Sequence, residues 1–199
     1  LVAEADIVIE NFKVGGRAKY GLDYASLSAL NPRLIYCSIT GFGQDGPYAN
    51  RAGYDYLVQG MSGLMSITGD ADGLPQKVGV AVTDIVTGLY ASTGILAAVE
   101  MRPRPGRGQQ IDMSLLDCGL AMLANQTMNY LATGTSPTRL GNVHPNIAPY
   151  EVVPVQDGHI ILAVGNDRQY QRFCTVIGRA DLAEDPRYQT NAGRVAARD

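Results

Sequence analysis

One carboxylate of the chain stands where it could act as a nucleophile. Asp84 lies where a glycine-broken apolar run, residues 78–82, turns into a helical pattern over residues 85–101. Thr83, directly before it, is expected to be the N-cap of that helix. Unpaired N–H groups and the positive end of the helix dipole meet there, so we expect Asp84 to be ionised near neutral pH and held at a defined place. In such a setting an aspartate more often only complements the dipole, and the rest of the chain must decide between the two roles.

Other polar side chains could together bind an anionic ligand with an extended body. They stand in loops after expected strands and in glycine-containing segments: Asn11, Lys13, Arg17, Lys19, Asp55, Arg107, Asn142 and His144. Each of them alone is more often a cap, a turn residue or a solvated charge. The residues by themselves therefore indicate an α/β ligand-binding or enzymatic segment, without an assigned chemistry.

Other catalytic chemistries find little support in the sequence. His144 and His159 lie in different expected elements, and no acidic cluster accompanies either at metal-ligand spacing, so no metal site is expected. No GxSxG elbow marks the nucleophile of an α/β-hydrolase. The glycines of residues 41–46 superficially resemble a dinucleotide-binding motif, but they lead into a loop rather than a helix.

The bulk composition limits the class of protein. With 199 residues, 46% hydrophobic and 18% charged, the chain is expected to be globular and long enough for one domain or parts of two. A net charge of −3 gives no general attraction to nucleic acid, and no apolar run is judged to reach the length of a transmembrane helix, so no membrane is expected. The three cysteines form no CxxC pair, so we expect reduced thiols in a cytoplasmic protein. Both ends fall in expected helices, which suggests a segment of a longer chain.

The elements that must position these residues begin with a strand–helix–strand unit. Residues 6–10 and 34–39 are apolar, β-rich runs, and residues 23–30 between them predict a short helix. Such a unit is typical of a parallel sheet in an α/β domain. Ligands of open α/β sheets bind beyond the carboxyl ends of the strands, so residues 11–13 and 40–43 are expected on one functional edge.

Further along the chain the pattern predicts more helices, one strand and a second domain. A helix over residues 54–65 is expected, and residues 102–108 break the helix that follows Asp84. After the break we expect a strand at 109–113 and one long helix over 115–131. Residues 150–155 and 159–164 around Asp157-Gly158 predict a β-hairpin, and residues 167–177 a helix. The change in composition near residue 150 indicates that a smaller domain starts there.

Six segments form a motif series that runs in order over essentially all of the chain: residues 9–13, 31–43, 53–55, 83–84, 106–109 and 139–146. As a set, these motifs resemble those of the class III CoA-transferases. This family includes formyl-CoA transferase, carnitine CoA-transferase and succinyl-CoA-dependent dicarboxylate CoA-transferases.

The resemblance implies an architecture as well as an activity. It implies an α/β fold in which residues 1–133 are the C-terminal part of a Rossmann-like large domain with parallel strands and the helices that follow it. Residues 134–149 would be a linker with an active-site loop, and residues 150–199 the start of a small α+β domain. Family members are about twice as long, and they form interlocked homodimers.

The resemblance also implies that Asp84 is the catalytic nucleophile. Its carboxylate would attack an acyl-CoA thioester to form an aspartyl anhydride and then an aspartyl-CoA thioester, from which a second carboxylic acid takes the CoA. Covalent catalysis of this kind divides one difficult exchange into easier steps, and the start of a helix can help to supply N–H donors for the oxyanion. Coenzyme A, as the acyl-CoA substrate, would be the only cofactor, without a metal. The partners would be an acyl-CoA and a small organic acid, with a weak indication of a dicarboxylate.

Carried over by position, the family's substrate-binding and CoA-binding residues fall on three segments and one basic side chain. They are Asn11, Phe12, Lys13, Lys19, Gly53, Tyr54, Asp55, Gly141, Asn142 and His144. Lys13 and Lys19 stand where the family commonly has arginine, so each would face phosphate as a point charge without the bidentate fork. The last three belong to residues 141–147, which match a loop that covers the site.

Two other functions compete with CoA transfer. The α-methylacyl-CoA racemases share the fold and use a His/Asp pair, but Tyr54 stands at the histidine position here. A phenol with a pKa near 10 is a poor general base at neutral pH, which disfavours this isomerase. The third hypothesis is a non-catalytic CoA-binding fragment, which would bind CoA without transferring it.

Overall fold

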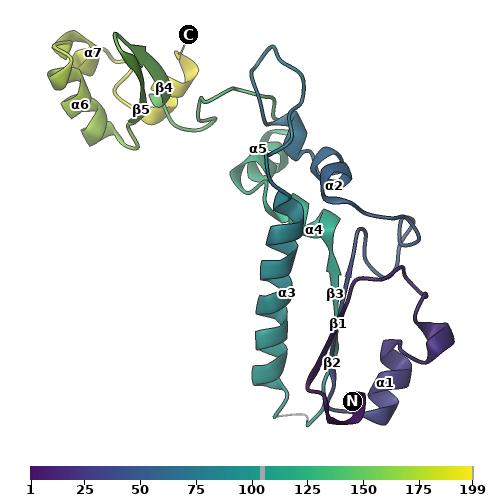
Figure 1. The fold of residues 1–199 in the computed structure, drawn as a ribbon. Coiled ribbons are helices and arrows are strands. Elements are labelled where there is room, and N and C mark those ends of the chain that lie inside the picture. Colours follow the sequence, from purple (N-terminus) through teal and green to yellow (C-terminus); the bar gives the residue numbers. More distant parts are fainter. Residues whose placement is uncertain (104–105, 199) are drawn as a thin grey trace. The chain divides into compact units, whose positions relative to one another are not determined.

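The computed structural model describes residues 1–103 and 106–198, and the chain divides into two compact units (Figure 1). The first unit consists of Leu1–Thr68 and Pro75–Pro137, and the second of Gly69–Leu74 and Thr138–Asp199. This division falls inside the predicted linker, residues 134–149, whose own boundaries stay a prediction. Arg104 and Pro105 of the predicted break lie outside the described residues.

The first unit is built on a parallel sheet. Its strands are β1 (Ile7–Glu10), β2 (Ile35–Thr40) and β3 (Gln110–Ser114), in the order β1-β2-β3 with both pairings parallel. Helix α1 (Tyr24–Leu30) makes the crossover from β1 to β2. The predicted strand–helix–strand unit and the mixed α/β class are therefore confirmed.

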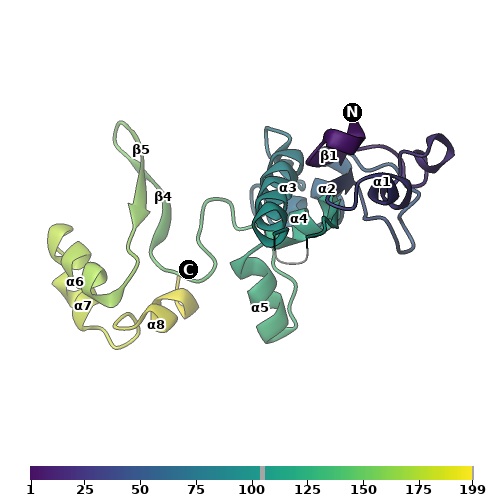
Figure 2. The same ribbon diagram turned by 90° about the horizontal axis from the view of Figure 1, so that it is seen from below.

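Helices cover both faces of this sheet. Successive residues of a strand point to opposite faces, so Leu34 and Tyr36 pack with Leu27 of α1, whereas Ile35 and Cys37 pack against α3 (Val82–Met101). The buried face of α3 follows helical spacing, and its residues are Thr83, Thr87, Ala91, Ile95 and Ala98. The last three of them form a core cluster with Ile35 and Cys37 of the sheet. Helix α3 runs alongside the sheet in Figure 1, and Figure 2 looks along its axis. Its packing on β2 and β3 fixes the axis of the helix that carries Asp84.

Helix α3 is also longer and more apolar than the sequence analysis expected. Its 20 residues have a mean hydropathy of 1.5 over an 18-residue window, so by length and composition it is long enough to cross a membrane. The expectation that no apolar run reaches that length is therefore wrong. Packing on the sheet accounts for the apolar character of one side of the helix, and 22% of the window is buried within the structure.

Two predicted helices differ from those in the structure. The single helix expected over residues 115–131 is wrong, because the chain forms α4 (Leu115–Ala121) and α5 (Asn125–Thr133) with a turn between them. Ala124 at this turn has φ 45°, a conformation that a non-glycine residue rarely adopts. No glycine or proline beside it indicates a turn in the sequence. The helix expected over residues 54–65 is shorter, since α2 (Asp55–Met61) ends before Gly63, which has φ 90°.

The short 3-10 turns of the first unit connect these elements. They are η1 (Val2–Glu4), η2 (Ala18–Tyr20) and η3 (Leu64–Ser66).

The second unit contains a hairpin and three helices. Strands β4 (Tyr150–Val155) and β5 (Gly158–Ala163) pair antiparallel, which confirms the predicted hairpin. The helices α6 (Asp167–Val176), α7 (Ala180–Glu184) and α8 (Asn191–Ala196) follow. A small core forms around Val164, Tyr170 and Cys174.

The buried guanidinium of Arg194 ties this unit together. It is 3% exposed and donates hydrogen bonds to the carbonyl oxygens of Ala148 (2.7 Å) and Tyr188 (2.8 Å) and to Asp167 Oδ1 (2.8 Å). The guanidinium also lies 4.4 Å from the centre of the Tyr170 ring. One side chain of α8 therefore links the loop before β4, the segment before α8 and the first turn of α6.

Candidate active site

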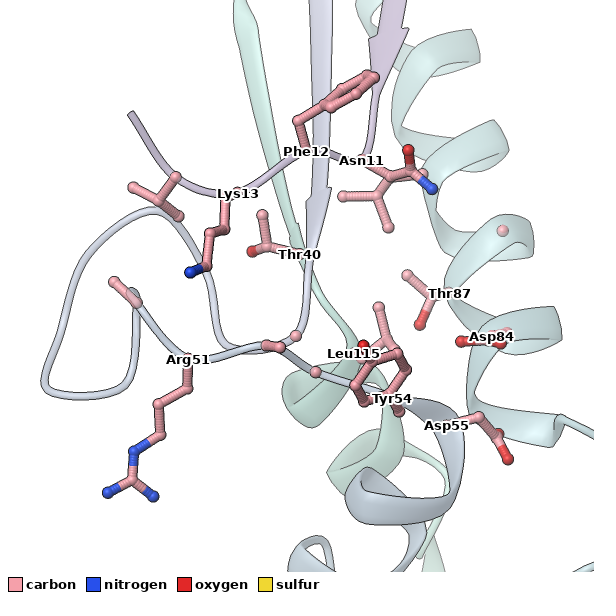
Figure 3. Close-up of a pocket in the computed structure, with 17 residues that line it drawn as sticks. Asn11, Phe12, Lys13, Thr40, Arg51, Tyr54, Asp55, Asp84, Thr87 and Leu115 are labelled. Carbon is pink, nitrogen blue, oxygen red and sulfur yellow. The ribbon is translucent and has the colours of Figure 1, made fainter. Parts of the chain in front are cut away.

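A cavity of about 620 Å³ opens in the first unit where β1 and β2 end. Seventeen residues line it (Figure 3). Seven of the residues predicted from the sequence are among them: Asn11, Phe12, Lys13, Gly53, Tyr54, Asp55 and Asp84. The structure therefore brings together residues separated by more than 70 positions in the chain.

The ends of two parallel strands form one wall of the cavity. Asn11 and Lys13 follow β1 directly, and Thr40 is the last residue of β2. Glu10 Oε2 accepts a hydrogen bond from the N–H of Phe12 (2.8 Å), which fixes the turn that leaves β1. The predicted meeting of residues 11–13 and 40–43 at the carboxyl edge of the sheet is confirmed for residues 11–13, Thr40 and Gly41, whereas Phe42 and Gly43 are not among the residues that line the cavity.

Two glycines let a second wall approach the first. A Cβ atom on Gly53 would lie 2.2 Å from Gly41 Cα, and a Cβ on Gly41 would lie 2.4 Å from Gly53 Cα. Only a backbone without side chains at both positions can cross so closely. This crossing holds Tyr54 and Asp55 against the end of β2, so Gly53 serves the geometry of the cavity, and its contact with a substrate stays a prediction.

Asp84 lies in the first turn of α3, but its helix is capped differently from the prediction. The helix begins at Val82 after Ala81, so Thr83 is inside the first turn and is not the N-cap. Asp55 from α2 performs the capping instead: its Oδ1 accepts from the N–H of Thr83 (2.8 Å) and from Thr83 Oγ1 (2.7 Å). A partner 28 residues earlier in the chain therefore satisfies the helix end that a local residue was expected to satisfy.

The N–H groups at the start of α3 are already in use. Those of Val82 and Ile85 donate to the carbonyl oxygens of Val80 (2.8 Å) and Ala81 (3.1 Å), and that of Thr83 donates to Asp55. These three groups therefore cannot supply the oxyanion donors that the sequence analysis placed there.

Two carboxylates of opposite character face this end of the cavity. Partial burial, and after it the negative charge of Asp55, raises the pKa of the Asp84 carboxyl. Burial would also raise the pKa of Asp55, but hydrogen bonds from Thr83 and Gln59 hold it below its usual value. Asp55 is thus the carboxylate stabilised as an anion. The charged form of Asp84 is disfavoured, whereas the sequence suggested that the start of the helix would stabilise it.

Two cations line the same cavity. Figure 3 shows Lys13 and Arg51 grouped apart from Asp84 and Asp55. The Arg51 guanidinium stacks on the Tyr48 ring at 4.1 Å, and Tyr48 meets Phe42 edge-on with ring centres 5.5 Å apart. The cavity therefore has a cationic part and an anionic part.

Arg51 and Thr87 are cavity residues that sequence reasoning missed. Arg51 stands two residues before Gly53, a position that could have drawn attention to it. Thr87 lies one helical turn after Thr83, and its Oγ1 donates to the Thr83 carbonyl oxygen (2.6 Å). Its place one helical turn after Thr83 is the signal in the sequence that could have found it.

The remaining predicted residues are not among those that line the cavity. Lys19 lies in η2 with its Nζ 4.8 Å from the Tyr20 ring. Gly141, Asn142 and His144 belong to the second unit, where the His144 ring lies 5.2 Å from that of Tyr150. Contacts of these four residues with CoA stay predictions.

The part of the chain that the structure describes contains no cluster of side chains that could bind a metal ion. Within residues 1–103 and 106–198, no three His, Cys, Asp or Glu side chains stand close enough together to hold an ion. The chemistry offered by the described cavity residues is that of carboxylates and cations.

Known proteins resemble the chain over its whole length. Residues 1–199 match the sequence profile of CoA-transferase family III. The succinate--glutarate CoA-transferase of Agrobacterium fabrum is 65% identical over 196 residues, which are 98% of this chain and 49% of that protein. The acetyl-CoA:oxalate CoA-transferase of Acetobacter aceti is 43% identical over 200 residues, which are 100% of this chain and 51% of that protein.

A solved structure resembles the chain as well. A CAIB/BAIF family protein from Brucella suis aligns with a TM-score of 0.80 and 61% sequence identity, and the alignment covers 99% of this chain and 52% of that one. The chain thus spans about half the length of the curated relatives that it matches.

Proposed function

The chain belongs to CoA-transferase family III, and on that premise we propose that the protein transfers CoA from an acyl-CoA to a carboxylic acid with Asp84 as the nucleophile. The observation that carries this proposal is the place of Asp84 in the cavity at the strand ends, beside Tyr54 and Asp55 and apart from the cations Lys13 and Arg51. Such a cavity can bind the phosphates of an acyl-CoA near the cations, while the thioester of the same molecule lies near the carboxylate of Asp84.

The proposed reaction balances without a redox step or a net transfer of protons. An oxygen of Asp84 attacks the thioester carbon of the acyl-CoA, the carbon–sulfur bond breaks, and a mixed anhydride and CoA thiolate form. The thiolate attacks Cγ of Asp84 and releases the donor acid as its carboxylate, which leaves an aspartyl-CoA thioester. The acceptor carboxylate then attacks the same carbon, the carbon–sulfur bond breaks, and a second mixed anhydride and CoA thiolate form. The thiolate attacks the acyl carbon of the acceptor in this anhydride, so the new acyl-CoA forms and Asp84 leaves as its carboxylate.

The raised pKa of Asp84 suits this role. A carboxylate that is poorly satisfied as an anion gains by forming a neutral anhydride or thioester, so partial burial and the nearby charge of Asp55 favour its attack. The attack requires the ionised carboxylate, so ionisation of Asp84 near neutral pH is part of this proposal.

We propose further that the donor or acceptor is a small dicarboxylate, because the Agrobacterium relative is named a succinate--glutarate CoA-transferase. The anionic part of the CoA would face Lys13 and Arg51. The three-stranded parallel sheet would belong to a Rossmann-like large domain, and the protein would act as an interlocked homodimer. Light scattering on the full-length protein tests the dimer.

The experiment that tests the function is exchange of labelled CoA by the full-length protein, with a panel of acyl-CoA donors and acceptor acids. Asp84→Ala should abolish both exchange and the acyl-enzyme that hydroxylamine traps. Asp72→Ala, on the exposed 69–74 segment, is the matched control and should behave as the wild type. Turnover that survives Asp84→Ala would refute the role of Asp84.

The competing functions give other results in the same assays. An isomerase would exchange deuterium at the α-carbon of an acyl-CoA with no acceptor acid present. A non-catalytic CoA-binding protein would bind CoA without transferring the label, even as the full-length chain.

A further inference from the structure

A buried amide stands behind the two carboxylates of the cavity. Gln59 on α2 is 0% exposed, although glutamine is usually a surface residue. Its Nε2 donates to Asp55 Oδ2 (2.7 Å) and to the carbonyl oxygen of Val80 (3.3 Å), and its Oε1 accepts from the N–H of Val78 (2.8 Å). Both ends of the amide are therefore satisfied.

These contacts allow the amide only one orientation. If it were flipped, Oε1 would face the Asp55 carboxylate and the Val80 carbonyl oxygen, and Nε2 would face the N–H of Val78. Each hydrogen bond would become a contact between two acceptors or two donors. The donor side of Gln59 is thus fixed toward Asp55, so the amide restrains that carboxylate as well as the backbone around Val80.

Gln59 restrains the Asp55 carboxylate and the backbone of residues 78–80, and both contribute to the position of Asp84. Asp55 carries the hydrogen bonds that cap α3 through the N–H and hydroxyl of Thr83, the residue before Asp84. The residue before the helix, Ala81, has no capping side chain, and it directly follows Val80. The first turn of α3 therefore depends on groups that Gln59 positions from α2.

We propose that Gln59 is a positioning residue for the nucleophile: its amide orients the Asp55 carboxylate and the 78–80 segment so that the first turn of α3 presents Asp84 to the cavity. This inference rests on the proposed function of Asp84. Gln59 lies outside the cavity lining, so it acts through Asp55 and the backbone rather than on the substrate.

The simpler explanation is that Gln59 only fills the core between α2 and the start of α3. In that case Gln59→Leu would change stability, but it would not act through Asp55 and would leave the kcat of the folded protein unchanged. The charged and titratable groups that line the cavity with Asp84 are Asp55, Tyr54, Lys13 and Arg51. A carboxyl group introduced at position 59 would add a further acid beside Asp55.

The test uses Gln59→Leu and Gln59→Glu in the full-length protein, with labelled-CoA exchange as the assay. Gln59→Leu should lower kcat by about 10²-fold, which is the loss expected when a reacting group is displaced by about 1 Å. The KM for acyl-CoA should change little. Gln59→Glu should move the acidic limb of the pH profile to higher pH, because a second negative charge disfavours ionisation nearby.

Two controls separate positioning from folding. Ser62→Ala changes the buried residue that directly follows α2; it removes a hydroxyl that donates to the carbonyl oxygen of Gln59 at 3.4 Å and should keep wild-type kcat. In a double-mutant cycle, Gln59→Leu should cost little more once Asp55→Ala is present, since the amide acts through that carboxylate.

The outcomes distinguish this inference from the function on which it rests. If Asp84→Ala is inactive while both Gln59 variants keep wild-type kcat and pH profile, the inference is wrong and the function stands. Losses from Gln59→Leu and Asp55→Ala that simply add would also overturn it. If Asp84→Ala retains turnover, the proposed function itself fails.

Discussion

Replacing Gly53 with alanine tests whether the glycine crossing positions the carboxylates of the cavity. The new Cβ would lie 2.2 Å from Gly41 Cα, and real Cβ contacts essentially never fall below 3.0 Å, so the two backbones must separate by at least 0.8 Å (3.0 − 2.2). No rotamer can relieve this contact, because both partners are backbone atoms. The Gly41 carbonyl oxygen is held by the N–H of Leu116 (3.1 Å), so part of the movement must fall on the chain from Gly53 to Asp55.

The displacement is large compared with the tolerance of the site. If the whole 0.8 Å fell along the 2.8 Å bond between the Thr83 N–H and Asp55, the bond would lengthen to 3.6 Å, beyond the range of a hydrogen bond, and a smaller share would still weaken it. We expect Gly53→Ala to lower kcat by about 10²-fold, the scale given by a misplacement of about 1 Å. Overpacking of this kind should also cost about 1–3 kcal/mol of unfolding free energy.

The assay is CoA exchange by the full-length protein together with urea denaturation. Gly41→Ala should give the same two losses, because the contact is reciprocal at 2.4 Å. Gly60→Ala is the matched control: its Cβ would meet only Met65 Sδ, at an ordinary 3.7 Å, and alanine favours the helix by about 0.5–1 kcal/mol. If Gly53→Ala keeps wild-type activity and stability, the crossing does not set the geometry of the cavity, and the reasoning fails.

Two further predictions concern charge. Asp55→Asn removes the negative charge that, after burial, raises the pKa of Asp84, so the acidic limb of the kcat/KM profile should move to lower pH; a shift to higher pH would contradict this cause. Its kcat should also fall, since the asparagine Nδ2 would face a donor in either orientation, Gln59 Nε2 or the N–H of Thr83. In the second unit, Arg194→Leu leaves the carbonyl oxygens of Ala148 and Tyr188 without their donor and should cost roughly 3 kcal/mol in denaturation. Arg172→Leu on the exposed face of α6 is its control, and equal stability of the two variants would refute the structural role of Arg194.

The strands, the parallel sheet and the edge at which the cavity lies could all be predicted from local patterns. Apolar runs around a short helix indicate parallel strands, and parallel strands place the residues after their carboxyl ends at one edge. Asn11, Lys13 and Thr40 meet for this reason alone. Asp84 could be recognised as the candidate nucleophile from its motif series, and the hairpin of the second unit from Asp157-Gly158.

The strands, most of the helices and the edge of the sheet that carries the polar residues follow from the spacing of neighbours along the chain, so they can be read without a structure. The division of residues 115–131 into α4 and α5, and the partner that lies opposite each site residue, depend on how the elements pack. Asp55 caps α3 in place of Thr83, Gln59 holds Asp55, and Gly41 meets Gly53. Each of these contacts joins different elements, and its energy depends on a distance that exists only after the elements have packed together.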